Sequence, residues 1–261
     1  MAGSSRHVRN RCNREGSRTK MDVVMIKPTR ARSAGKWSMP GILVLAAALG
    51  LSGQATTPSP AFNPAPGEPV VTYSRSFKGS QPAFLQVEVA RNGQAEFEVR
   101  MADGQPMQTL VFTASPRVVA QVFALTRKAK EFSRPLEDRH DKVGYTGTKM
   151  LAYDDAGQHH QQVFNFTRVK PAADLQGLFE AIGDTGTHAL RLQESARYDP
   201  LGVVKELGLI AVDWNENQMA EPSIILPVLR QVSANTNLMD IARKRARILI
   251  QRMTGTAKAG R

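Results

Sequence analysis

The sequence predicts an α+β fold, in which an antiparallel β-meander and a β-hairpin pack against helices and a mainly helical C-terminal part follows. Three observations predict it. Apolar residues alternate strictly in residues 95–101, where Phe97, Val99 and Met101 share one side of a strand. Asn92-Gly93 precedes this strand, and this dipeptide is typical of a hairpin turn. From about residue 189, apolar residues recur at helical spacing.

Four strands are expected between Val70 and Thr113. The first begins near Val70, and the second covers about residues 83–90. The third is the alternating segment 95–101, and the fourth covers residues 107–113, after a turn at Asp103-Gly104. Strands joined by short turns run antiparallel, so this order excludes a doubly wound α/β fold.

A helix is expected to begin at Ser115-Pro116, with Ser115 as the N-cap and Pro116 in the first helical position. Its apolar residues share one face, and they are Val118, Val122, Leu125, Ala129 and Phe132. A second hairpin is expected next, with arms at residues 143–153 and 158–167. In its second arm, Val163 should face away from Phe164 and Phe166.

The remaining elements are expected to be helices. One should begin at Pro171, with Gly183 and Gly186 as candidate interruptions. Two further helices should cover about residues 200–209, after an N-cap at Asp199, and 222–232. The last helix carries an apolar stripe, which consists of Leu238, Ala242, Ala246, Leu249 and Met253.

The N-terminal residues 1–55 have the pattern of a bacterial signal peptide. Basic residues precede the uncharged apolar run 41–51, and Ser52-Gly-Gln-Ala55 supplies small residues before a predicted cleavage between Ala55 and Thr56. The basic region is too long when counted from Met1, so translation is expected to start at Met21 or Met25. The alternative is a retained anchor formed by residues 40–53, although a span requires about 20 apolar residues.

Four parts of the chain follow from this interpretation. Residues 1–55 are the signal, residues 56–69 form a linker with five prolines, residues 70–195 form an α+β core, and residues 196–261 form a helical part packed on the same domain. Residues 1–36 hold ten of the 35 Lys/Arg and two of the 23 Asp/Glu. The exported part is therefore only mildly basic, and no nucleic-acid partner is expected. The single cysteine, Cys12, precedes the cleavage site, so the exported part has no disulfide.

No motif in the sequence predicts a catalytic, cofactor or metal site. His159 and His160 are adjacent on a strand and point to opposite faces, so they cannot hold one metal ion together. His140 lies in a charged loop without a recognisable nucleophile. The loops 77–80 and 145–149 lack the spacing of a phosphate-binding loop, and their glycines favour a close backbone approach.

Three further features allow two interpretations each. The cations Arg243, Lys244 and Arg247 indicate either contact with an anionic surface or the solvated side of a docked helix. Trp214 is either an exposed recognition residue or a cover for the edge of the core. Glu96 and Glu98 share one face of a strand, as expected for a solvated face, and no partner carboxylate is evident.

The segment Ser76–Phe84, with the alternating strands up to Thr113 and the Asn92-Gly93 turn, resembles an uncharacterised family of small bacterial exported domains. That family typically has cysteines beside the glycine–proline segment, and this chain has none there. The resemblance therefore implies export, and it implies neither an activity nor a disulfide.

Taken together, the sequence favours an exported, non-catalytic binding or structural protein of the cell envelope, periplasmic or extracellular. Its partner would be an envelope protein or an anionic surface. One alternative is an envelope hydrolase with His140 or His188 as its base, at a site assembled from distant residues. The other is a membrane-tethered protein whose basic C-terminal helix faces lipid.

Overall fold

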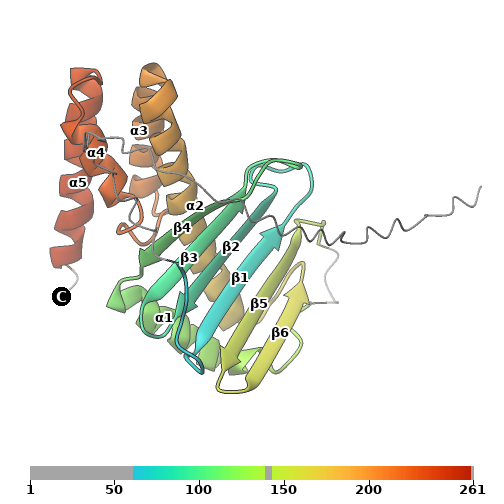
Figure 1. The fold of residues 1–261 in the computed structure, drawn as a ribbon. Coiled ribbons are helices and arrows are strands. Elements are labelled where there is room, and N and C mark those ends of the chain that lie inside the picture. The colour runs from blue at the N-terminus through green and yellow to red at the C-terminus, as the bar shows by residue number, and fades with distance from the viewer. Residues whose placement is uncertain (1–60, 139–142, 260–261) are drawn as a thin grey trace, which may run out of the picture. The chain divides into compact units, whose positions relative to one another are not determined.

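The computed structural model describes residues 61–138 and 143–259, with side chains up to residue 255. The predicted signal, its cleavage site and the two proposed start positions therefore lie outside the described residues, as does His140. The predicted fold class is confirmed, because an antiparallel six-stranded sheet and helices concentrated toward the C-terminus make up the described part (Figure 1).

The sheet has the strand order β4-β3-β2-β1-β5-β6, and every neighbouring pair is antiparallel. The strands are β1 (Val70–Ser76), β2 (Phe84–Ala90), β3 (Gln94–Arg100), β4 (Gln108–Thr113), β5 (Thr148–Asp155) and β6 (Gln158–Phe164). Strands β1 to β4 therefore form the expected meander. The β5–β6 hairpin joins the sheet through β5, which pairs with the edge of β1 opposite β2. β5 begins at Thr148, five residues later than the expected start at residue 143.

Helices α1 (Pro116–Lys128) and α2 (Lys170–Tyr198) cover one face of this sheet (Figure 1). The opposite face of the sheet is covered by none of the described helices. Alternation puts apolar side chains under the helices, and Tyr73, Val87 and Phe97 are fully buried there. Ser115 caps α1 and Pro116 opens it, as expected. Its apolar face continues into the short 3₁₀ turn Lys130–Phe132, where Phe132 completes the buried stripe.

Helix α2 runs through 29 residues, so the expectation that Gly183 or Gly186 would interrupt it was wrong. Both glycines instead lie against the sheet. A Cβ atom at Gly183 would touch Leu85 at 3.7 Å, and one at Gly186 would lie 2.6 Å from Cε1 of Phe97. The missing side chains allow the helix backbone to approach the strands closely, and this gain outweighs the low helix propensity of glycine.

The second half of α2 extends beyond the sheet and packs with three more helices. These are α3 (Pro200–Asn215), α4 (Leu226–Ala234) and α5 (Asp240–Ala259). α3 is six residues longer than expected. α4 begins four residues later than expected, because residues 222–225 form turns rather than helix. In α5 the predicted stripe from Leu238 to Met253 is buried as expected.

Glu221 ties these C-terminal helices to the start of α1. Its carboxylate is buried and accepts hydrogen bonds from Ser115 N at 2.7 Å and from the Ser223 hydroxyl at 2.6 Å. The hydroxyl oxygen of Ser223 also lies 3.1 Å from Thr113 O, so its single proton is shared between the two acceptors. A carboxylate at a helix N-terminus is stabilised by the helix dipole. Glu221 therefore fixes the loop before α4 against the sheet edge.

Asp199 is the N-cap of α3, as predicted, and its Oδ1 accepts a hydrogen bond from Gly202 N at 2.9 Å. We expect Asp199→Ala to lower the free energy of unfolding by about 1 kcal/mol, because that backbone N–H loses its partner. Asp199→Asn keeps an acceptor oxygen and should leave stability nearly unchanged. Denaturant unfolding of the two variants tests this, and unchanged stability in Asp199→Ala would show that the cap is unimportant.

Candidate functional site

Charged side chains gather where the middle of α2 meets α3. Glu180, Asp184 and His188 are spaced four residues apart, so they lie on one side of α2. From α3, Glu206 and Asp213 point toward His188. The sequence analysis singled out only His188 from this group.

His188 is held by two carboxylates. Its side chain is 7% exposed, with Nδ1 2.6 Å from Glu206 Oε1 and Nε2 2.7 Å from Asp213 Oδ2. Burial alone would lower the pKa of His188, but the hydrogen bonds and charges of Glu206 and Asp213 outweigh burial and raise it. The geometry is therefore that of an imidazolium that donates one hydrogen bond from each ring nitrogen.

This arrangement does not suit a general base. A base accepts a proton from its substrate on a free ring nitrogen, and both nitrogens of His188 face carboxylates. The geometry instead suits a structural link between two helices. Of the two histidines considered as the base of a hydrolase, only His140 remains a candidate, and it lies outside the described residues.

A second group of charges continues this line toward the sheet. Glu180 accepts a hydrogen bond from the Tyr73 hydroxyl and lies 3.3 Å from Nη1 of Arg75. Water reaches Asp184, yet the surrounding protein and the charge of Glu180 raise the pKa of its carboxyl to about 6, against the opposing effect of His188. Through Glu180 and His188, hydrogen bonds and ion pairs therefore link α2 to β1 and to α3. Asp184 lies between them, and the pKa of its carboxyl is close to neutral pH.

The two glycine loops lie side by side at one end of the sheet. Gly147 has a φ of +102°, and a Cβ there would lie 3.0 Å from Ser76 O, which confirms the expected close backbone approach at this glycine. At Gly79 an added Cβ would meet nothing within 4 Å, so the expected close approach was wrong there. The rings of Phe77 and Tyr145 meet edge to face, with centroids 5.7 Å apart. Nζ of Lys149 donates to Thr146 Oγ1 at 2.8 Å and to a backbone carbonyl at 2.7 Å. Lys149 thus links the loop before β5 to the chain after β6 through these hydrogen bonds.

His159 and His160 lie on β6 and belong to opposite faces of the sheet, as expected. Nδ1 of His159 pairs with Asp154, which is its cross-strand neighbour on β5. Within the described residues, no group of three or more His, Cys, Asp and Glu side chains is placed to hold a metal ion.

The open face of the sheet carries an acidic row, in which Glu96 and Glu98 share one face as expected. The expectation that they have no partner carboxylate was wrong, because Glu88 joins them. Glu88 on β2 stands directly opposite Glu96 on β3, and Glu98 follows on the same face. Partial burial and then the charges of Glu96 and Glu98 raise the pKa of Glu88. Partial burial and the charge of Glu98 also raise the pKa of Glu96. Like charges therefore face one another across β2 and β3.

The predicted cationic residues of α5 differ in their exposure and in their ion pairs. Arg243 and Lys244 pair with Asp240 at 3.3 and 2.7 Å, and Arg243 is mostly covered. Arg247 is exposed. The neighbouring Arg245 donates from Nη1 to Val204 O of α3 at 3.1 Å, so it links the two helices.

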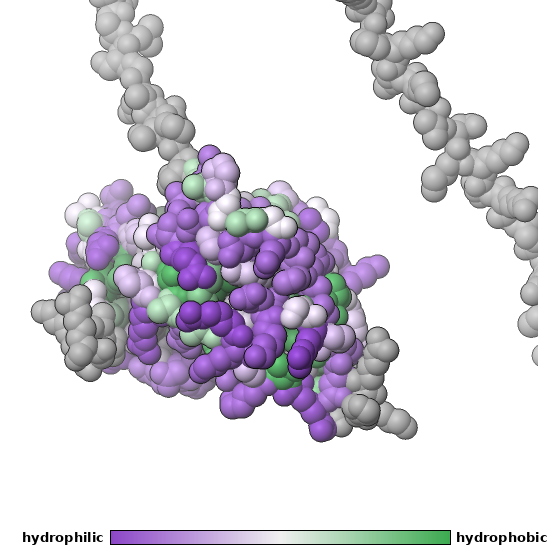
Figure 2. Space-filling model, turned by 90° about the horizontal axis from the view of Figure 1, so that it is seen from below, coloured by the Kyte–Doolittle hydropathy of each residue, from purple (hydrophilic) through white to green (hydrophobic). Residues whose placement is uncertain are grey.

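The four C-terminal helices form an end where exposed apolar side chains gather. α2 and α4 end there, and α3 and α5 begin there, at the upper end of Figure 1. We call the four residues the distal tip, and they are Tyr198, Leu201, Met239 and Ile241. Tyr198 is 79% exposed and Leu201 is 74% exposed, the largest values among the large apolar residues described. By contrast, hydrophilic residues cover most of the molecule seen from below in Figure 2.

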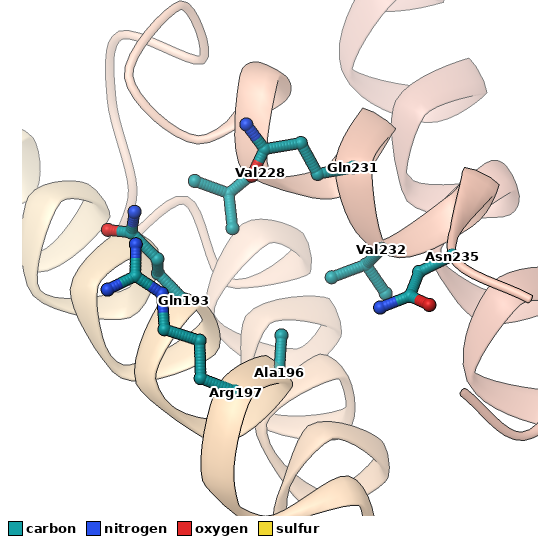
Figure 3. Close-up of a pocket in the computed structure, with 7 residues that line it drawn as sticks. All are labelled: Gln193, Ala196, Arg197, Val228, Gln231, Val232 and Asn235. Atoms are coloured by element: carbon teal, nitrogen blue, oxygen red, sulfur yellow. The ribbon is translucent and has the colours of Figure 1, made fainter. Parts of the chain in front are cut away.

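Two depressions flank the distal tip. The smaller, about 160 Å³ in volume, lies between α2 and α4, where Arg197 and the amides of Gln193, Gln231 and Asn235 surround apolar walls (Figure 3). The larger, about 480 Å³, is an open groove between α2 and α3, lined by charged and apolar residues that include Lys205 and Tyr198. Trp214 lies on neither and packs partly buried against the core, which confirms its interpretation as a cover for the core edge.

No protein-family model and no curated protein matches this chain. Among the described residues, no helix is both long enough and apolar enough to cross a membrane.

Proposed function

We propose that this protein is an exported, non-catalytic binding or structural module of the bacterial cell envelope, and that it meets its partner through the distal tip. The observation that carries the proposal is the exposure of Tyr198 and Leu201 at one end of a helical bundle. Large apolar side chains gathered on a surface mark interaction sites, whereas single ones need no explanation.

The internal charge clusters support a binding role over a catalytic one. His188 is enclosed by two carboxylates, and Lys149 donates to neighbouring loop atoms. These groups stabilise the arrangement of helices and loops. The export part of the proposal rests on the signal pattern of residues 1–55, with an anchor at residues 40–53 as the alternative.

Export is tested by fractionating cells that express the full chain and measuring the mass of the recovered protein. We expect a chain that begins at Thr56 in the soluble envelope fraction or in the medium. An intact N-terminus in the membrane fraction would favour the anchor. An intact chain confined to the cytoplasm would contradict the proposed function.

The binding surface is tested by cysteine labelling, because Cys12 is the only cysteine in the chain. In a Cys12→Ser background, Leu201→Cys is compared with Val163→Cys, which is 53% exposed on the open face of the sheet. We expect a water-soluble maleimide to label the Leu201→Cys variant severalfold more slowly in envelope preparations than in purified protein. The Val163→Cys variant should be labelled equally fast in both. Equal rates for the Leu201→Cys variant as well would mean that nothing covers the tip.

A further inference from the structure

We infer that the distal tip binds the surface of an anionic lipid bilayer. This inference rests on the proposed function and names the class of partner. It requires that the apolar residues of the tip lie together, that cations surround them, and that a bilayer fits the surface better than a protein does.

The contacts between helices place the tip residues at one end. The hydrogen bond between Arg245 and Val204 O joins α5 and α3 near their starts. Leu201 lies about one turn before Val204, and Ile241 about one turn before Arg245. Tyr198 ends α2 immediately before the Asp199 cap, and Met239 immediately precedes α5. The four exposed residues therefore lie at the end of α2 and at the starts of α3 and α5.

Cations surround the base of the tip. The exposed ones come from three helices, and they are Arg197 of α2, Lys205 of α3, and Lys244 and Arg245 of α5. Each lies within about two helical turns of the end of its helix at the tip. Arg197 and Lys205 have long side chains that can turn toward a surface that the tip contacts, whereas Lys244 pairs with Asp240 and Arg245 with Val204 O.

Four acidic residues lie near these cations, and three of them are already engaged. Asp240 pairs with Arg243 and Lys244, and the hydrogen bond and charge of Lys244 lower the pKa of its carboxyl. Asp199 accepts a hydrogen bond as the N-cap of α3. Glu206 lines the groove between α2 and α3 and is buried and paired with His188, and Glu194 is the fourth acidic residue, in the same groove. Arg191 also lines this groove, so together with Arg243 six cations stand against four acidic groups at the base of the exposed apolar end.

An anionic bilayer matches this surface in both respects. Protruding apolar side chains can enter the boundary between headgroups and acyl chains, where tyrosine is especially favourable, while Lys and Arg remain among the headgroups. A protein partner would need a hollow of matching shape to accept a protruding tip. A second copy joined through a symmetric tip-to-tip contact would place cations against cations. The charge and the protrusion therefore favour lipid.

The experiment measures co-sedimentation of the full chain with vesicles. One set contains phosphatidylcholine and phosphatidylglycerol in equal amounts, and the other contains phosphatidylcholine alone. We expect binding to the anionic vesicles that weakens as salt rises. Leu201→Ser should weaken it about tenfold, because the apolar contribution of one leucine is lost. Lys205→Gln should weaken it about fivefold, in anionic vesicles only.

Two variants serve as matched controls. Val163→Ser removes an apolar residue that is also more than half exposed, on the open face of the sheet, and should bind as the wild type does. Asp199→Asn keeps the helix cap, removes a negative charge from the tip and should strengthen binding to anionic vesicles about fivefold. Comparison of variants within the same full chain also separates the tip from any binding by the apolar run 41–51.

The outcomes separate this inference from the proposed function. The inference is overturned if the wild type ignores anionic vesicles, or if Leu201→Ser binds as tightly as Val163→Ser. If the Leu201→Cys variant is nevertheless protected from maleimide in envelope preparations, the partner is a protein and the proposed function stands. If that variant is also unprotected there, both proposals fail.

Discussion

Replacing His188 with alanine should lower the free energy of unfolding by about 3–5 kcal/mol at neutral pH, because removing one member of a buried ion group leaves its partners unpaired. Glu206 is almost fully buried and faces Nδ1 of His188 at 2.6 Å. Asp213 is less enclosed and loses its hydrogen bond at 2.7 Å. Unfolding in denaturant, followed by circular dichroism, measures the loss.

A second variant separates charge from packing. Adding Glu206→Gln to His188→Ala should recover part of the lost stability, because it removes the buried charge while leaving the α2–α3 interface in place. His159→Ala is the matched control, since His159 also pairs with an aspartate but on the exposed hairpin. It should change stability little. Equal losses at both histidines would contradict a special role for the buried one.

The same cluster makes stability depend on pH, with a definite sign. The pKa of His188 is raised in the folded protein, so its contribution is fully present below the ordinary imidazole value of 6.5 and is lost as pH rises through the folded pKa. Burial and Glu180 raise the pKa of Asp184 from 3.8 to about 6, so its ionisation also opposes folding as pH rises between those values.

The two groups can be separated by pH titration of stability. In His188→Ala the decline above pH 6.5 should become weaker, and the remainder should come from His159, whose pKa the hydrogen bond with Asp154 also raises. In Asp184→Asn the decline between 3.8 and about 6 should become weaker, because the raised pKa values of Glu88 and Glu96 remain, and stability at neutral pH should increase. Unchanged pH profiles in both variants would contradict the assignment of this dependence to α2.

Alternation and turn residues suffice to predict the strands, but not the pairing of charges across them. A two-residue turn at Asn92-Gly93 would have placed Glu88 opposite Phe97. The observed register, with Val89 opposite Ala95, implies a three-residue loop and sets Glu88 against Glu96. A shift of one residue in loop length therefore decides whether the acidic row exists, and this length is not readable from the turn dipeptide alone.

The buried histidine cluster left a weaker signal in the sequence. Glu206 stands within the apolar stripe of Val203, Leu207 and Ile210, where a charged side chain needs a partner. The identity of that partner depends on how α2 and α3 pack, and helix packing is not determined by spacing within one helix. The sequence could therefore indicate that Glu206 is paired, but it could not name His188 as the partner.

Replacing Gly186 with alanine should lower the free energy of unfolding by about 1–3 kcal/mol, although alanine is the better helix former. The new Cβ would lie 2.6 and 2.9 Å from two ring carbons of Phe97. Phe97 is fully buried, so its ring cannot move aside without disturbing the core. Gly186→Leu should be worse, because the larger side chain requires α2 to separate from the sheet.

Two other helical glycines make the test specific to this contact. Gly208 on α3 has no neighbour within 4 Å of an added Cβ, so Gly208→Ala should raise stability by about 0.5–1 kcal/mol. Gly183 would gain only ordinary contacts at 3.7 Å, so Gly183→Ala should fall between the other two. Helix propensity alone predicts stabilisation at all three positions, and only the close approach of α2 to the sheet reverses the sign at Gly186. Stabilisation by Gly186→Ala would therefore mean that helix and sheet are farther apart than described.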